Sequence, residues 1–101
     1  MKNCFNVDTF EEEIKNFGVP VIVDFYATWC GPCKMLEGEL ENIEDKIKIV
    51  KVDIDKFQKL TMNYRIMSVP TMIFFKDGEK SEEVIGFHTS DELLEVINGL
   101  K

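Results

Sequence analysis

Two cysteines separated by two residues, Cys30 and Cys33, are the side chains of this chain best suited to chemistry. Such a pair can either share a metal ion or exchange two electrons as a dithiol and a disulfide. A strand-like apolar run precedes the pair and a helix-like pattern follows it. Cys30 is therefore predicted at a helix N-terminus, where unpaired backbone N–H groups favour the thiolate. This setting favours redox chemistry.

A metal site is the main alternative. Tetrahedral zinc would need two further ligands, usually a second Cys-x-x-Cys or a pair of histidines. Beyond the pair the chain offers only Cys4 and His88, both interpreted as surface residues or bystanders. A cluster shared between two copies of the chain is conceivable, but nothing in the sequence requires it. We therefore interpret the pair as a redox-active disulfide, with no metal and no bound cofactor.

The residues around the cysteines fit that interpretation. Gly31 lets the turn close without a side chain, and Pro32 suits a first helical position because it lacks the N–H that would go unbonded there. Trp29 supplies a flat apolar wall next to Cys30, although ordinary core packing is the alternative. Asp24 interrupts an apolar run, and an inward orientation would raise its pKa towards neutrality. The alternative is that Asp24 and Lys51 both point to solvent.

The elements that must position these residues follow from hydrophobic periodicity. Helices are predicted from Asp8, with Glu11 as its capping-box partner, from Pro32 to about Asp45, over 56–64, and from a cap at Ser90. Strands are predicted over 21–26, 47–54, 71–75 and 83–85, with an edge strand over 3–7 and a hairpin turn at Asp77-Gly78. This order indicates a single α/β domain over residues 1–101 with parallel crossovers and a mixed sheet.

Composition excludes several classes of function. The 101 residues carry a net charge of −7, with 45% hydrophobic and 31% charged residues, which is typical of a soluble globular protein. The acidity disfavours binding to nucleic acid or to anionic membranes. No apolar stretch approaches the roughly 20 residues that span a bilayer. The N-terminus lacks an apolar secretion segment, so we expect a cytoplasmic protein.

Five stretches resemble the thioredoxin family, in the same order and over nearly the whole chain. They are 23–35, 50–55, 64–71, 75–78 and Gly86. The resemblance implies a thioredoxin fold, with a central mixed β-sheet of four or five strands flanked by four helices. It also implies reduction of disulfides in other proteins through a mixed disulfide, with Cys30 as nucleophile and Cys33 as the resolving thiol.

The resemblance implies roles for the neighbours as well. Asp24 would transfer a proton with Cys33, and Lys51 would sit beside that carboxyl group. Trp29, Val69, Pro70 and Gly86 would bind substrate: a cis Val69–Pro70 bond would leave the Val69 backbone free to pair with an extended segment, and Gly86 would allow close approach. A monomer that takes electrons from a thioredoxin reductase and passes them to disulfide-containing proteins is the expected arrangement.

Two other functions share the fold. A disulfide-forming oxidase or isomerase often has histidine between the cysteines, where this chain has Pro32. A non-catalytic binding subunit would need neither the cysteines nor Asp24 and Pro70.

The chain also departs from the family pattern. Glu37-Gly38 replaces the usual helix proline, Tyr26 stands where many members have tryptophan, and Phe87 is bulky beside Gly86. Glu37 is predicted to face water, whereas the methionines are predicted in the core: Met62, Met67 and Met72.

Overall fold

A central strand of buried residues organises the fold, and helices cover both faces of its sheet. The computed structural model describes residues 2–3, 10–16 and 19–100. Its elements are β1 (Lys2–Asn3), α1 (Phe10–Asn16), β2 (Val21–Tyr26), α2 (Gly31–Glu41), β3 (Lys48–Asp53), α3 (Gln58–Asn63), β4 (Thr71–Lys76), β5 (Glu79–Ile85) and α4 (Ser90–Asn98). The predicted helices and strands are all represented, although several bounds differ. Of the edge strand predicted over 3–7, Asn3 belongs to β1, and residues 4–7 lie outside the described part of the chain.

The sheet is mixed, as predicted, with strand order β1-β3-β2-β4-β5. β3 runs parallel to β1 and β2, whereas β4 runs antiparallel to β2 and β5. The two parallel pairs require crossovers, and α2 supplies the crossover between β2 and β3. β2 therefore has hydrogen-bonded neighbours on both sides, which agrees with its almost continuous apolar sequence.

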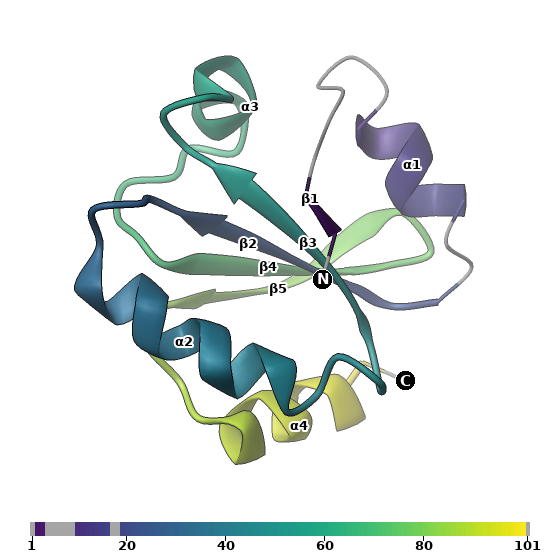
Figure 1. The fold of residues 1–101 in the computed structure, drawn as a ribbon. Helices are drawn as coiled ribbons and strands as arrows, with labels where there is room; N and C mark the ends of the chain where they lie inside the picture. The colour runs from purple at the N-terminus through teal and green to yellow at the C-terminus, as the bar shows by residue number, and fades with distance from the viewer. Residues whose placement is uncertain (1, 4–9, 17–18, 101) are drawn as a thin grey trace.

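Alternation along β2 decides which residues meet which helices. α1 and α3 lie on one face of the sheet, and α2 and α4 lie on the other (Figure 1). Val21, Val23 and Phe25 belong to the core on the α1/α3 face, and Ile22 belongs to the core on the α2/α4 face. Because successive side chains of a strand point to opposite faces, Asp24 lies on the same face as Ile22, towards α2.

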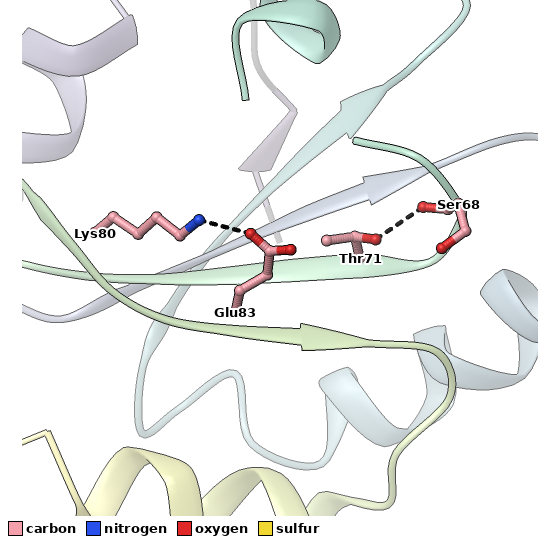
Figure 2. A network of polar contacts seen from close by, with 4 residues as sticks. All are labelled: Ser68, Thr71, Lys80 and Glu83. Atoms are coloured by element: carbon pink, nitrogen blue, oxygen red, sulfur yellow. Dashed lines mark hydrogen bonds and ion pairs between the residues drawn. The ribbon is translucent and has the colours of Figure 1, made fainter. Parts of the chain in front are cut away.

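The hairpin between β4 and β5 confirms the turn predicted at Asp77-Gly78. Both turn residues have positive φ angles, 53° and 80°, as a type I′ turn requires. β5 begins at Glu79 rather than at residue 83, because pairing with β4 extends the strand through exposed charged residues. Lys80 and Glu83 form an ion pair on it at 2.6 Å (Figure 2).

The predicted start of α2 agrees to within one residue, and its predicted end is wrong. α2 begins at Gly31, with Pro32 second, and ends at Glu41 instead of near Asp45. After it the chain continues in tight turns, in which the Ile43 N–H donates to the Leu40 carbonyl at 3.1 Å. These turns keep the apolar spacing of a helix without its hydrogen bonds, which explains the longer prediction.

The cap of α4 is Thr89 rather than Ser90. The Thr89 hydroxyl accepts from the Glu92 N–H at 3.3 Å, and the Glu92 carboxylate accepts from the Thr89 N–H at 2.9 Å. Glu92 lies three residues after Thr89, which is the spacing of a capping box. The predicted Asp8 cap with Glu11 and the surface position of Cys4 lie outside the described residues.

The methionine prediction is correct only for Met72, which is fully buried. Met62 and Met67 are 76% and 93% exposed. No helix in the described part of the chain is long and apolar enough to span a bilayer.

Candidate functional site

The two cysteines form a disulfide at the N-terminus of α2, with their Cα atoms 5.3 Å apart. Cys30 is the N-cap residue, and its Sγ accepts a hydrogen bond from the Cys33 N–H at 3.2 Å. Both residues are buried. In the dithiol form the same N–H and the positive end of the helix favour a thiolate on Cys30. The helix therefore distinguishes the two sulfur atoms.

The loop before β4 brings Val69 beside the cysteines. The expected cis bond between Val69 and Pro70 is present, and the Val69 carbonyl oxygen lies 3.7 Å from Cys30 Sγ. The Thr71 hydroxyl donates to the Ser68 carbonyl at 2.8 Å, which holds the loop at the start of β4 (Figure 2). The loop and the helix N-terminus thus form one surface.

Gly86 forms a backbone hydrogen bond with the other side of this loop. Its N–H donates to the Pro70 carbonyl at 2.8 Å, and its φ of 88° is in the region that favours glycine. A Cβ atom placed on Gly86 would have no atom of the described chain within 4 Å, so the space above it is open. His88, interpreted from the sequence as a surface residue or bystander, has its Nδ1 3.2 Å from the Gly86 carbonyl oxygen.

Trp29 is 67% exposed, so the alternative of core packing is wrong. Its indole N–H donates to Asp55 Oδ2 at 3.0 Å, which fixes the ring beside the cysteines. An apolar groove of about 330 Å³ begins at the ring; it is lined by Trp29, Ile54, Ile66, Met67, Ser68 and Val69. The exposed Met67, which is predicted in the core from the sequence, is part of this groove.

Asp24 is buried, with 1% of its surface exposed, and the solvent-facing alternative is therefore wrong. Burial is the main cause that raises the pKa of Asp24 to about 7. The positive charge of Lys51 acts in the opposite direction, and the negative charge of Glu37 adds to the increase. Asp24 Oδ1 has no hydrogen-bond partner among the described residues. A carboxyl group in this state exchanges a proton near neutral pH.

Lys51 is the neighbour of Asp24 across the β2–β3 pair. Its ammonium group lies 3.1 Å from Glu37 Oε1 and 4.4 Å from the centre of the Tyr26 ring. The first of these contacts is not predicted from the sequence, from which Glu37 is expected to face water. The signal was the spacing: Glu37 follows Cys33 by four residues, one turn of the same helix face.

A pocket of about 250 Å³ connects these residues with the second cysteine. It is lined by Tyr26, Ala27, Thr28, Cys33, Lys34, Glu37 and Lys51. Cys33 thus faces the charged pair, whereas Cys30 faces Val69. In the described part of the chain, no group of three or more histidine, cysteine or acidic residues could hold a metal ion.

A buried cysteine pair that caps a helix, beside a cis-proline loop on a mixed α/β sheet, defines a thiol–disulfide oxidoreductase. The comparisons with known proteins specify the family. A family model described as thioredoxin matches residues 2–99. Thioredoxin from Listeria monocytogenes is 45% identical over 94 residues, which cover 89% of each chain. Thioredoxin from Rickettsia bellii is 42% identical, over 89% of this chain and 90% of its own.

Solved structures agree with the sequence comparison. Fasciola hepatica thioredoxin is 28% identical and superposes with a TM-score of 0.89, and the superposition covers 100% of both chains. A thioredoxin mutant from Halobacterium salinarum gives 0.89 at 34% identity, over 97% of this chain and 88% of its own. The chain belongs to the thioredoxin family. It is a protein-disulfide reductase of the thioredoxin type, and its redox group is the Cys30–Cys33 disulfide.

Proposed function

We propose that the chain reduces protein disulfides in two steps that use its cysteines unequally, with Cys30 as nucleophile and Cys33 as resolving thiol. The observation that carries this assignment is the N-cap position of Cys30, whose Sγ accepts the Cys33 N–H. A thiolate there attacks one sulfur of a substrate disulfide. A bond forms between Cys30 and that sulfur, the substrate bond breaks, and the other substrate sulfur leaves as a thiolate.

Cys33 completes the reaction. Its thiolate attacks Cys30 Sγ, the internal disulfide forms, and the remaining substrate sulfur leaves. Two electrons have then passed from the cysteine pair to the substrate. Asp24 is the base that takes the Cys33 proton, since the carboxyl group is buried on the face covered by α2 and its pKa is about 7. Lys51 is the supporting residue beside Asp24, where its charge limits the increase in the pKa of that carboxyl group. Gly31 and Pro32 hold the turn between the cysteines.

The substrate is proposed to bind as an extended segment across Trp29, Val69, Pro70 and Gly86. The Val69 carbonyl lies beside Cys30 Sγ, and an extended chain can pair with backbone groups at such a position. The groove that starts at Trp29 accepts apolar side chains. Recognition through backbone pairing depends little on sequence, so we expect many disulfide-containing proteins to be substrates.

A thioredoxin reductase is the proposed electron donor, since the family relation implies one and the chain contains no Gly-x-Gly-x-x-Gly motif of its own. We further propose that the protein works as a monomer in the cytoplasm. The acidic net charge of −7 gives no support for nucleic acid or membrane partners.

The test is to trap the intermediate. The Cys33→Ser variant is expected to accumulate a mixed disulfide with a disulfide-bonded peptide, because the resolving thiol is missing. The Cys30→Ser variant is expected to form none, because the activated sulfur is missing. Mass spectrometry of the unreduced mixture distinguishes the two results. Accumulation with Cys30→Ser but not with Cys33→Ser would reverse the roles.

A further inference from the structure

Glu37 is a charged residue of the site to which the proposed mechanism gives no role, although it binds Lys51. We propose that Glu37 is a positioning residue for the proton transfer: by binding the Lys51 ammonium group, it keeps Lys51 from pairing with Asp24. The inference rests on the proposed function, in which Asp24 is the base for Cys33. It adds a residue that the redox chemistry itself does not require.

The geometry shows which of two carboxylates Lys51 binds. Asp24 and Lys51 are directly paired on the neighbouring strands β2 and β3. The backbone pairing alone would therefore favour Asp24 as the partner of the Lys51 side chain. The ammonium group nevertheless lies 3.1 Å from Glu37 Oε1. The Tyr26 ring, 4.4 Å away, helps to hold it there. Asp24 Oδ1, in contrast, has no hydrogen-bond partner in the described part of the chain.

The charged groups that act on Asp24 are Lys51 of β3 and Glu37 of α2. Cys33 lines the same pocket as these two residues. On β4, the residue opposite Asp24 is the apolar Met72, and α4 adds Leu93 to the apolar core on this face. Burial has the largest effect on the pKa of Asp24, Lys51 lowers it, and Glu37 raises it. Lys51 and Glu37, the two partners of one ion pair, thus change the pKa of Asp24 in opposite directions.

This opposition has a chemical consequence. A general base works best when its pKa lies near the operating pH. If Lys51 paired directly with Asp24, the carboxylate would be stabilised and would become a weaker base for the Cys33 thiol. Glu37 prevents this by occupying Lys51, and it takes neither a proton nor an electron itself. We therefore expect Glu37 to determine the pH range over which Cys33 is activated.

The experiment measures the titration of Asp24 and the rate of the second step in the same variants. Carbon-13 NMR of the Asp24 carboxyl group in the dithiol form gives the midpoint, and quenched reactions give the rate of release from a mixed disulfide against pH. Glu37→Gln is expected to lower both midpoints by roughly half a pH unit or more. Lys51→Met is expected to raise them. Glu41→Gln is the control and should leave both midpoints unchanged, since Glu41 is exposed one helical turn farther along α2.

The opposite shifts separate positioning from a structural role. If the ion pair only stabilised the fold, both variants would lose the same contact, and midpoints that shift together or stay fixed would overturn the inference. Asp24→Asn tests the underlying mechanism separately. It should remove the pH-dependent limb of the release rate, and Glu37→Gln should have no further effect in that background. If Asp24→Asn leaves the limb in place, the base has been assigned wrongly and the inference falls with it.

Discussion

Burial of the Asp24 carboxyl group suits its proposed role as a base, but it lowers the stability of the folded protein when the group is ionised. Asp24 lies in a strand between apolar neighbours and has 1% of its surface exposed. The ammonium group of Lys51, which acts on it, is already bound to Glu37 at 3.1 Å. The folded protein therefore favours the protonated carboxyl group, whereas the unfolded chain ionises it at its ordinary pKa of 3.8. This difference makes stability depend on pH.

Asp24→Asn is expected to stabilise the protein in neutral and alkaline solution. Between pH 3.8 and about 7 the folded state holds a proton that the unfolded state releases, so the free energy of unfolding falls as the pH rises through this window. Above it the whole penalty is present, up to about 4 kcal/mol. Asparagine carries no such penalty. Urea unfolding at pH 4 and at pH 8 should show the variant's advantage growing with pH.

The control for this prediction is Asp45→Asn, which removes a carboxyl group from the exposed turns after α2. Its free energy of unfolding should equal that of the parent protein at pH 4 and at pH 8. A constant difference between Asp24→Asn and the parent protein, independent of pH, would contradict the assignment of the penalty to ionisation.

At the scale of elements, α2 carries both the reactive residues and part of the core. Its N-cap and first turn hold the two cysteines, and Glu37 follows on the next turn. Leu36 and Leu40 are buried against the sheet. The helix is continuous through Gly38. Gly38 is exposed, and a Cβ atom there would meet no atom within 4 Å in the described part of the chain. Nothing in its surroundings requires glycine.

Gly38→Ala is accordingly expected to raise the free energy of unfolding by about 0.5–1 kcal/mol, since glycine costs this much in a helix interior. Disulfide reduction should be unchanged. The matched variant is Gly86→Ala, which also has open space but has a φ of 88°. It should be destabilised instead, because alanine rarely adopts that conformation. Chemical denaturation of both variants checks the signs, and a loss of stability in Gly38→Ala would refute the argument.

The elements also show where sequence reasoning succeeds. β2 was predicted with its observed bounds, because five apolar residues out of six are a local signal, and the Asp77-Gly78 turn was predicted because two positive φ angles select few residue types. The end of α2 was predicted too late in the chain. The turns that follow the helix have hydrogen bonds from residue i to residue i−3, and they bury the same positions as a helix would.

The site residues divide in the same way. Cys30, Cys33 and Asp24 follow from residue type and from a strand–helix junction. The contacts of Glu37 and Met67 were missed: the spacing from Cys33 indicates which helix face carries Glu37, but the residues that surround both side chains come from distant parts of the chain. Glu37 meets Lys51 on β3, and Met67 lies in a groove that starts at Trp29.

At the scale of the whole molecule, one sheet separates two cores. One contains Leu60 and the other Leu40, and both side chains are buried. β2 and β4 contribute residues to each core, so neither core can form without the strands of the other. We expect residues 1–101 to behave as one cooperative unit, as is usual for a chain of this size.

Leu40→Ala and Leu60→Ala test that expectation. Each removes a buried side chain from one core and should cost about 2–5 kcal/mol. Each variant should unfold in a single transition. Far-ultraviolet circular dichroism and proton NMR of methyl groups in the opposite core should report the same midpoint. Two separated transitions would show that the cores unfold independently.

The position of Trp29 has a practical consequence. It is the only tryptophan in the chain, it directly precedes Cys30, and a hydrogen bond to Asp55 holds its exposed ring. All of the indole emission of the protein therefore arises beside the reacting sulfur atoms. A disulfide quenches such emission more strongly than two thiols do, so the oxidation state of the site can be followed optically, without a label and without altering any residue.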